Sequence, residues 1–430
     1  MSSKDIMDHV KDIEEISSPF KTLYGSKHLK FKKSLSPSPE LESYTNELIY
    51  YILQNYVTLK EKTLQSKMSQ LCKKYSIGKR PKYFILNYII KQKIDNNDIN
   101  EIDYNILNEY LISKKSRSLS GILEIAIMTS PGEFSCAYDC YYCPNQPGMP
   151  RSYVADGPSA RRALTWAFDT VGQFHERASA YALNGHPVDK IEVIVLGGTW
   201  DSYDINYQRE FITKVYFASN TFYNTETRDM LSMEEEILQN ESAMCKIIGL
   251  TIETRPDQIS EEQILRLLSY GVTRVQIGIQ HTNNRILKGI NRQCTIEQVY
   301  DAIYLLKEAG LKVQTHWMPN LPNSTPELDK RMFDELNYNP LLQSDDIKIY
   351  PTIVTQTSDR DSEEVYTVIE KWFNSGKYVP YSHEELVEVI IYGKENIRPW
   401  VRISRIFRDI PMGNILGGAD VPNMREELAK

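Results

Sequence analysis

The stretch Cys136-Ala-Tyr-Asp-Cys140-Tyr-Tyr-Cys143 decides how this sequence is interpreted. Its three cysteines follow the spacing CxxxCxxC, and an aromatic residue, Tyr142, precedes the last of them. Three thiolates can hold three irons of a [4Fe-4S] cluster and leave the fourth iron open to a small molecule. A structural zinc ion needs a fourth ligand, and the nearest candidate, His175, lies roughly thirty residues further on in a predicted helix. The stretch therefore predicts a three-cysteine iron–sulfur site, with zinc binding and packed thiols as the alternatives.

The composition is that of an ordinary soluble globular protein. The chain has 430 residues, 41% hydrophobic and 25% charged, which allows one large domain or two or three smaller ones. The formal net charge of −7 argues against indiscriminate coating of nucleic acid and leaves room for a local basic surface that binds a folded RNA. No apolar run reaches the length of a membrane span, and the N-terminal MSSKDIMDHVKDIEEISS is not a secretory signal. We therefore expect a cytoplasmic protein with no membrane partner.

The six cysteines are too sparse for a disulfide framework. Cys72, Cys245 and Cys294 are scattered outside the CxxxCxxC stretch. We expect these three to be packing or surface thiols.

The first part of the chain divides into a predicted tail and a predicted helical domain. Residues 1–42 end near Ser34-Leu-Ser-Pro-Ser-Pro39, which is typical of a flexible tail or linker. Over residues 43–115, apolar residues recur at helical spacing around 48–56 and 64–71, and less regularly at 84–90 and 102–111. A group of lysines in the tail is either a solvated segment or a phosphate-contacting arm: Lys27, Lys30, Lys32 and Lys33.

Basic residues gather in and just after the helical domain, and Tyr75 and Tyr83 lie among them. Basic side chains mixed with aromatic ones suit contact with RNA. A solvated face explains the same pattern, so both interpretations stay open on this evidence. The residues concerned are Lys73, Lys74, Lys79, Arg80, Lys82, Lys114, Lys115 and Arg117.

Short apolar runs alternate with helical stretches from residue 121 onward. This alternation predicts an α/β fold with a parallel sheet, and six units in a row predict a partial (β/α)6 barrel over residues 116–352. Residues 353–430 are expected to form a C-terminal α/β extension that closes the open side of the barrel. The expected strands are 122–128, 191–196, 247–252, 275–279, 313–318, 347–350 and 400–407, and the expected helices are 159–183, 206–219, 260–269, 295–309, 326–336, 362–375 and 382–396.

The cysteine stretch follows the first strand, where barrels of this kind carry their chemistry. In that position CxxxCxxC resembles the signature of radical S-adenosylmethionine (SAM) enzymes, in which a barrel shields a reactive radical from water. A glycine pair after the second strand binds the SAM amino group in those enzymes. Gly197, Gly198 and Thr199 stand there in this chain, with Thr in place of the usual Glu. A plain tight turn is the alternative.

Further polar residues follow the next strands. Glu253, Arg255 and Asp257 come after the third strand and suit a ribose or a carboxylate, or form a loop ion pair. Gln280, preceded by Gly278, ends the fourth strand, and Arg292 lies in the following loop, so these are expected at the same mouth or as structural residues. His316 and Asn320 belong to the fifth strand and its loop, and His316 is expected to be a packing residue.

Longer segments of the chain resemble the catalytic subunit of the Elongator complex, a radical SAM tRNA-modifying protein. The similarity covers roughly residues 44–430 and is specific, because general radical SAM enzymes share only the cysteines and the glycine turn. The matching segments are 73–81, 117–121, 157–163, 188–199, 251–257, 270–274, 318–323, 348–352 and 405–411.

The resemblance implies a transferase reaction. A 5′-deoxyadenosyl radical takes hydrogen from the methyl group of acetyl-CoA, and a carboxymethyl group is added to C5 of the wobble uridine, position 34, of tRNA. It implies a [4Fe-4S] cluster, SAM and acetyl-CoA, no DNA partner, and a tRNA surface on the helical domain. The residues at Gly197, Gly198, Thr199, Glu253, Arg255, Gln280 and Arg292 would bind the cofactor, and Lys190 would contact acetyl-CoA.

Two departures from the family pattern matter. Eukaryotic members have a longer spacer between the first two cysteines. In the family a zinc-binding segment and an acetyltransferase-like domain follow the barrel, and neither is seen before Lys430. We expect the acetyl-CoA-binding domain to be supplied in trans, alone or with Elongator-like subunits, or else trimmed away or lost. The alternatives are a radical SAM enzyme with another RNA or small-molecule substrate, and a non-catalytic tRNA-binding scaffold.

Overall fold

The computed structural model describes residues 37–132, 136–224, 228–355, 367–408, 410 and 412–418. The lysines at 27–33 lie outside these residues. The chain divides into two compact units, and each is described by itself. Unit 1 takes in the described parts of Met1–Ile125, Val171–Glu192 and Thr213–Ile248, and unit 2 those of Ala126–Thr170, Val193–Ile212 and Gly249–Lys430.

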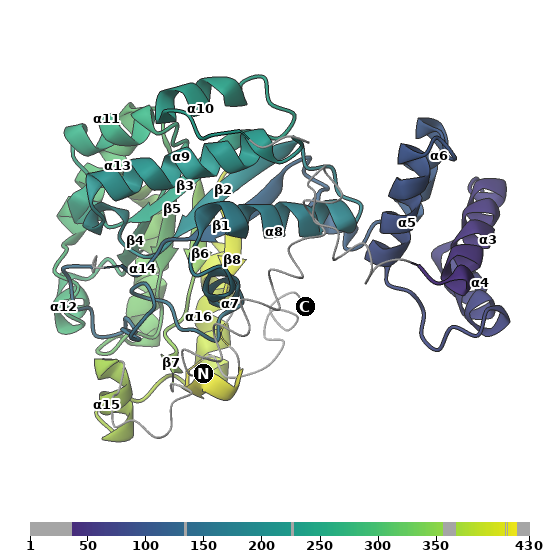
Figure 1. Ribbon diagram of the computed structural model, residues 1–430. Helices are drawn as coiled ribbons and strands as arrows, with labels where there is room; N and C mark the ends of the chain where they lie inside the picture. The colour runs from purple at the N-terminus through teal and green to yellow at the C-terminus, as the bar shows by residue number, and fades with distance from the viewer. Residues whose placement is uncertain are drawn as a thin grey trace. The chain divides into compact units, whose positions relative to one another are not determined.

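Four helices at the start of unit 1 confirm the predicted helical region (Figure 1): α3 (Pro39–Asn55), α4 (Glu61–Lys74), α5 (Tyr83–Asp95) and α6 (Glu101–Leu111). The Ser38 side chain accepts a hydrogen bond from the Leu41 amide and Pro39 occupies the first turn, so α3 begins earlier than the predicted boundary at residue 43. The helices bury one apolar cluster, which includes Tyr44, Leu48, Ile52, Leu64, Met68, Leu71, Leu86, Ile90, Leu107 and Leu111. A short turn, η1 (Lys115–Arg117), follows.

A seven-stranded sheet forms the α/β part, in the order β1-β2-β3-β4-β5-β6-β8. All six predicted barrel strands are confirmed, and the pairs from β3 to β8 are parallel. The sequence placed 400–407 in an extension, whereas β8 pairs in register with β6, Asp346 opposite Arg402 and Ile347 opposite Ile403. The strands are β1 (Leu123–Met128), β2 (Lys190–Leu196), β3 (Lys246–Thr254), β4 (Arg274–Gln280), β5 (Lys312–Trp317), β6 (Asp346–Ile349) and β8 (Arg402–Ile406).

The helices between the strands agree with the prediction except in three places. The expected helix at 159–183 is wrong, because the chain breaks between α7 (Pro158–Thr165) and α8 (Thr170–Leu183), where Ala167 and Phe168 take positive φ angles of 47° and 63°. The predictions missed α10 (Met233–Asn240) and α12 (Asn284–Gly289). The remaining elements are η2 (Trp200–Ser202), α9 (Ile205–Thr221), η3 (Pro256–Gln258), α11 (Glu261–Ser269), α13 (Ile296–Glu308), α14 (Pro326–Tyr338) and η4 (Pro340–Leu342).

The C-terminal region adds two helices and a small second sheet. α15 (Val368–Asn374) lies within the predicted helix at 362–375, of which residues 362–366 fall outside the described residues, and α16 (His383–Glu395) confirms the next one. β7 (Val354–Thr355) pairs antiparallel with β9 (Ile415–Gly417), after η5 (Met412–Asn414).

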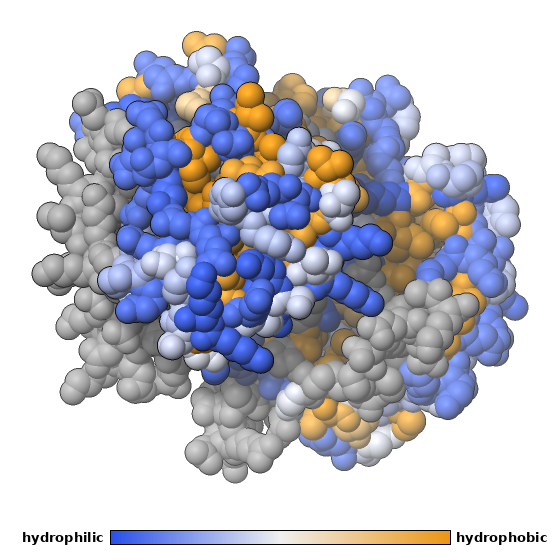
Figure 2. Space-filling view, turned by 90° about the vertical axis from the view of Figure 1, so that its right-hand side faces the viewer, coloured by the Kyte–Doolittle hydropathy of each residue, from blue (hydrophilic) through white to orange (hydrophobic). Residues whose placement is uncertain are grey.

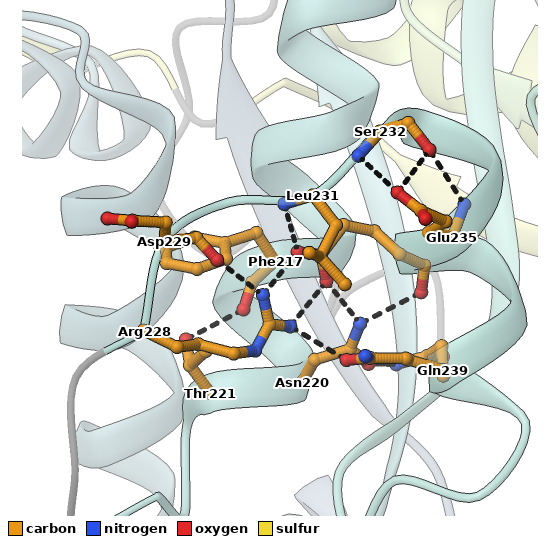
Figure 3. Close-up of polar contacts among 11 residues, drawn as sticks. Phe217, Asn220, Thr221, Arg228, Asp229, Leu231, Ser232, Glu235 and Gln239 are labelled. Atoms are coloured by element: carbon orange, nitrogen blue, oxygen red, sulfur yellow. Dashed lines mark hydrogen bonds and ion pairs between the residues drawn. The ribbon is translucent and has the colours of Figure 1, made fainter.

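α10 is held to α9 by a buried polar network (Figure 3). The Glu236 carboxylate, with none of its side chain exposed, takes both arms of the Arg228 guanidinium at 2.6 Å. It also accepts hydrogen bonds from the Leu231 amide and from the Asn220 side chain. A buried carboxylate needs such partners, and here they anchor the start of α10 together with the capping box of Ser232.

Candidate functional site

The cysteine stretch forms a loop after β1, and neighbouring loops of unit 2 fix its backbone. The Tyr141 amide donates to the Ile290 carbonyl at 3.0 Å, and the Tyr141 carbonyl accepts from the Ile369 amide at 3.1 Å. Cys140 is buried, while Cys136 and Cys143 are half-buried. The three thiols therefore belong to a folded loop.

Two buried arginines surround Cys140. The Arg255 Nη1 atom lies 3.6 Å from the Cys140 Sγ atom, and the Arg292 Nη1 atom lies 3.8 Å from it. Arg255 is itself fixed, because its guanidinium makes a bidentate ion pair with Asp257 at 2.9 and 3.1 Å and donates to the Arg292 carbonyl at 2.7 Å. Its flat face covers the Tyr138 ring at 3.4 Å. Positive charge is thus built in beside a sulfur atom.

The pKa of Cys143 depends on its burial and on the neighbouring thiols and arginine. Burial raises the pKa of Cys143 to about 11, and nearby Cys140 and Cys136 act in the same direction while Arg151 opposes them. Cysteines bind metals as thiolates, so iron binding would displace this proton. The Arg151 Nε atom is buried without a hydrogen-bond partner. Arg151, Arg255 and Arg292 therefore fit a metal-containing group that would be bound by cysteine thiolates.

Among the described residues, no three His, Cys, Asp or Glu side chains converge closely enough to hold one ion. A structural zinc ion needs four converging ligands. An iron–sulfur cluster instead spreads its cysteine ligands over different irons. His175, the nearest candidate for a fourth zinc ligand, lies in unit 1, where the Ala218 carbonyl accepts a hydrogen bond from its Nε2 atom at 2.9 Å.

The predicted glycine turn after β2 lies beside the cysteine loop. Gly197 and Gly198 have φ angles of 153° and 85°, in the region that favours glycine. A Cβ atom on Gly197 would collide with the Thr129 side chain, and one on Gly198 would come within 3.0 Å of the Arg151 carbonyl. The Thr199 hydroxyl lies 3.3 Å from the Cys136 Sγ atom. The turn thus requires both glycines and reaches the first cysteine.

The ends of β4 and β5 carry unpartnered polar atoms. Gln280 has a positive φ of 74° at a register shift between these strands, and its Oε1 atom is buried with no hydrogen-bond partner. A Cβ atom on Gly278 would come within 2.5 Å of the Gln280 side chain, so the Gln280 side chain would have to shift. Strain together with an unpartnered buried acceptor is typical of a ligand site.

Glu253 and His316 lie together in unit 2. The Glu253 carboxylate accepts a hydrogen bond from the Tyr153 hydroxyl at 3.1 Å and lies 3.9 Å from the His316 Nδ1 atom. Burial lowers the pKa of His316 well below its ordinary value, and Lys348, Arg408 and Arg292 act in the same direction. His316 is therefore neutral, and its buried Nε2 atom has no partner. His316, which was expected to be a packing residue, thus has a carboxylate near its Nδ1 atom and a buried Nε2 atom without a hydrogen-bond partner.

Comparisons with known proteins agree with this geometry. Residues 134–335 match the Radical SAM superfamily, and residues 344–430 match the Radical_SAM C-terminal domain. The tRNA uridine(34) acetyltransferase of Methanocaldococcus infernus is 36% identical over 89% of this chain and 69% of its own length. Elongator complex protein 3 of Homo sapiens is 30% identical over 92% of this chain and 70% of its own length, and that of Saccharomyces cerevisiae 32% over 86% and 64%.

The chain belongs to the Elongator complex protein 3 family. The solved structure of Methanocaldococcus infernus Elp3 with an N-terminal deletion (1–46) is 36% identical, with a TM-score of 0.59 over 72% of this chain and 62% of that one. The α/β radical SAM fold is confirmed, and the radical SAM family implies a [4Fe-4S] cluster and SAM. The chain spans about two thirds of the length of the relatives named above.

The basic residues predicted in the family's tRNA-binding region line hollows in unit 1. One hollow of about 480 Å³ includes Lys73, Lys79 and Arg80, and another of about 370 Å³ includes Arg80, Lys82 and Tyr83. Figure 2 shows the molecule from the right-hand side of Figure 1, where hydrophilic side chains cover most of the surface in front and orange apolar ones lie among them. Arg80 belongs to both hollows, so they adjoin.

Not every predicted basic residue is free for a ligand. The Lys74 Nζ atom lies 2.5 Å from Glu47, which Lys67 also contacts at 3.2 Å. Hydrogen bonds from Lys74 and Tyr75 lower the pKa of Glu47 to about 2. Lys114 and Arg117 line a third hollow, whereas Lys115 does not. Lys190 is exposed beside Asp189, and it begins β2 while Gly197 follows the end of that strand.

Three residues of the cysteine surroundings were missed. Tyr138 lies within the CxxxCxxC stretch, Arg151 follows it closely, and Tyr153 contacts Glu253. Their signal in the sequence was only proximity to the cysteines, since an isolated Tyr or Arg has no distinctive spacing.

No described helix combines the length and apolar composition that a membrane crossing requires.

Proposed function

We propose that this chain is a radical SAM enzyme that modifies the wobble uridine, position 34, of tRNA in the cytoplasm. The finer proposal is that it adds a carboxymethyl group from acetyl-CoA to C5 of that uridine. The observation that carries the proposal is a loop cluster of unit 2, in which the Thr199 hydroxyl beside the two-glycine turn lies 3.3 Å from Cys136 and two buried arginines lie 3.6 and 3.8 Å from Cys140. The names of its relatives, tRNA uridine(34) acetyltransferase and Elongator complex protein 3, support the substrate.

The residues of the loop cluster would hold the cofactors. Cys136, Cys140 and Cys143 are the proposed ligands of a [4Fe-4S] cluster, which with SAM supplies a 5′-deoxyadenosyl radical when bound. Arg255 and Arg292 place positive charge beside the Cys140 sulfur atom, which would suit the negative charge of a bound cluster. Their burial also excludes water from that sulfur atom.

The strand ends would orient the rest of SAM. Gly197 and Gly198 let a ligand approach the backbone closely, and Thr199 adds a hydroxyl at the same turn. Glu253 is the proposed acceptor for ligand hydroxyl groups, and Gln280 offers its unpartnered Oε1 atom. Arg255 is already engaged by Asp257, so we assign it to holding Cys140 and Tyr138 in place.

Acetyl-CoA and tRNA complete the proposal. Lys190 is the proposed contact for acetyl-CoA, since its ammonium group is exposed and, among the described residues, makes a 3.5 Å contact with the Asp189 carboxylate. Lys73, Lys79, Arg80 and Lys82 are the proposed contacts for tRNA phosphates. Elongator-like subunits, or a separate acetyl-CoA-binding domain, are the proposed protein partners.

The test is anaerobic reconstitution with iron and sulfide, followed by SAM, dithionite, acetyl-CoA and tRNA. Mass spectrometry measures 5′-deoxyadenosine and the modified uridine. Acetyl-CoA deuterated at the methyl group should pass deuterium into 5′-deoxyadenosine. Cys140→Ala should abolish cluster absorbance and SAM cleavage, whereas Cys72→Ala, a buried thiol outside the loop, should leave both intact.

Each other outcome contradicts a defined part of the proposal. SAM cleavage that ignores acetyl-CoA would indicate a radical SAM enzyme with a different substrate. A cluster that forms without any SAM cleavage, in a chain that binds tRNA, would indicate a scaffold. Cluster formation in Cys140→Ala at the level of the unaltered chain would contradict the assignment of the ligands.

A further inference from the structure

A third hollow in unit 1 lies beside the last turns of α8 and includes Lys114 and Arg117 of the predicted basic residues. We call it the α8 pocket. Its volume is about 150 Å³, roughly five times the ~30 Å³ that one water occupies in the liquid. Six of its lining residues can meet an anion or shape its walls: Lys114, Arg117, Arg177, Tyr181, Asn184 and His186.

The sequence builds this pocket from two segments that hydrogen bonds hold together. The Ser113 amide donates to the Asn184 carbonyl at 3.0 Å, and the Ser118 hydroxyl lies 2.8 Å from the His186 Nδ1 atom. Between these two ties, Lys114 has a left-handed backbone, with φ and ψ both 57°, just before η1. A non-glycine residue in that conformation costs free energy, so the turn that carries Lys114 and Arg117 is held in place by its ties to α8 and His186.

The walls of the pocket fix an arginine. The Arg177 guanidinium lies over the Tyr181 ring, 4.4 Å from its centroid, and donates to the Tyr181 hydroxyl at 2.9 Å. That hydroxyl donates in turn to the Glu124 carbonyl at 2.9 Å. A guanidinium held flat in this way presents its remaining N–H groups in a fixed fork, which suits the oxygen atoms of a phosphate.

The charge in the pocket has one sign. None of the described lining residues is an Asp or Glu. Burial lowers the pKa of His186, a backbone hydrogen bond at Ser113 opposes this, and nearby Arg117 and Arg177 lower it further. The same positive field that discourages a proton on His186 attracts an anion. His186 is buried and tied to Ser118, so it shapes the wall while Lys114, Arg117 and Arg177 supply charge.

We propose that the α8 pocket binds a phosphate group. A phosphate group suits the three cations of the pocket, because its oxygen atoms can accept hydrogen bonds from each of them. The phosphate could belong to the backbone of an RNA strand or to the end of a small nucleotide-like molecule, and both present the same oxygen atoms to the three cations. This inference stands on the geometry of unit 1 and does not depend on the proposed radical chemistry.

The first test titrates inorganic phosphate into the full chain without a cluster and follows binding by phosphorus NMR. Arg117→Gln removes an exposed cation from the rim and should weaken binding about tenfold. Lys115→Gln removes the same charge from the neighbouring turn residue, which does not line the pocket, and should change affinity less than about twofold. Circular dichroism confirms that both variants fold.

The result that overturns the proposal is equal weakening by Arg117→Gln and Lys115→Gln, which would indicate only a general positive field. Absence of phosphate binding, or binding of acetate as tight as that of phosphate, overturns it as well. Arg177→Lys keeps the charge but removes the fork, and should still weaken phosphate binding severalfold.

Competition then identifies the source of the phosphate. Displacement of inorganic phosphate by a short single-stranded RNA, but not by adenosine bisphosphate, supports a backbone phosphate. Displacement by adenosine bisphosphate, but not by RNA with unphosphorylated ends, supports a terminal phosphate. Displacement by neither overturns the proposal. SAM cleavage is measured separately, so failure of the pocket and failure of the proposed function give different patterns.

Discussion

Charged side chains have opposite surroundings in two regions of the molecule. Beside the cysteine loop, Arg255 and Arg292 are buried, and protein groups accept their hydrogen bonds. In the helical part of unit 1, Lys79 and Lys82 are exposed and line hollows. A buried charge without its partner destabilises the fold, whereas an exposed charge contributes little to stability and much to binding. The first region should therefore respond to mutation through folding, and the second through ligand affinity and salt.

The largest effect is expected from Asp257→Asn. This change leaves the Arg255 guanidinium buried and without its bidentate carboxylate, so the free energy of unfolding should fall by roughly 3–5 kcal/mol. Urea denaturation measures the change, and faster reaction of Cys140 with a thiol reagent should accompany it. Asp301→Asn, at an exposed position on α13, is the control and should change stability by less than about 0.5 kcal/mol.

If Asp257→Asn lowers the free energy of unfolding by less than about 1 kcal/mol, no more than is expected for a surface ion pair, the proposed difference between the two regions is wrong. It would mean that solvent reaches the Arg255 guanidinium despite its burial.

The second effect tests a buried charge in unit 1, away from the hollows. Glu236→Gln should lower the free energy of unfolding by about 2–3 kcal/mol, because Arg228 loses its paired carboxylate. Burial alone would raise the pKa of Glu236, but the hydrogen bonds from Arg228, Leu231 and Asn220 outweigh it and leave the pKa below the ordinary value.

The pH dependence of this variant follows from that direction. A carboxyl group whose pKa is lower in the folded state stabilises the fold above its unfolded pKa, and the stabilisation is lost as the pH falls through the folded pKa. The difference in unfolding free energy between the unaltered chain and Glu236→Gln should therefore be largest near pH 7 and shrink in acid. Glu241→Gln, exposed just after α10, should show neither effect. A difference that grows in acid would contradict the assignment.

Much of the fold around these two regions could be predicted from the sequence. The cysteine spacing and the glycine pair are local patterns that are visible in the sequence. The six barrel strands are continuous apolar runs, so each strand was predicted correctly. The partner of β8 was not, because strand pairing is non-local and Arg402–Ile406 carries no mark of its neighbour β6. The break between α7 and α8 has no Gly or Pro to signal it, since Ala167 and Phe168 take the positive φ angles.

The missed helices differ in what the sequence offered. α12, with six residues, is too short for a helical period to show. α10 did carry a signal, the capping box formed by Ser232 and Glu235. Within the site, Arg255 was expected to hold a ligand or an ion pair, and the structure shows the ion pair with Asp257. Burial of both partners decided this, and burial of a single loop residue is not visible in a sequence.

The third effect belongs to the exposed region. Replacing Lys79, Arg80 and Lys82 together by Gln should weaken tRNA binding about tenfold at moderate salt and leave the unfolding midpoint unchanged. Each lost phosphate contact reduces the slope of log K against log salt, by about 0.9 for duplex and about 0.7 for single strands, so the slope should fall by about 2–3. Filter binding over a range of salt concentrations measures both.

The control for this triple variant changes three exposed lysines elsewhere, Lys246, Lys312 and Lys371, to Gln. It removes the same net charge and should alter affinity less than about twofold. If both triple variants weaken binding equally, the hollows are not specific contacts and the basic residues form only a solvated face.

The smallest effect is expected from Asp139→Asn, which removes an exposed charge within the cysteine loop itself. Asp139 lies next to Cys140 in sequence, yet its side chain is 74% exposed, so solvent reaches its ion pair with Arg151 from the carboxylate side. Asp139→Asn should therefore change the free energy of unfolding by less than about 1 kcal/mol, in contrast to Asp257→Asn on the buried side of the same cysteine. Iron content after reconstitution should stay unchanged, because the Asp139 carbonyl, which holds the Asn291 side chain at 2.8 Å, survives the substitution. A larger loss of stability in Asp139→Asn would contradict this contrast. It would mean that the exposure of a carboxylate near the cysteine loop does not determine how much its removal destabilises the fold.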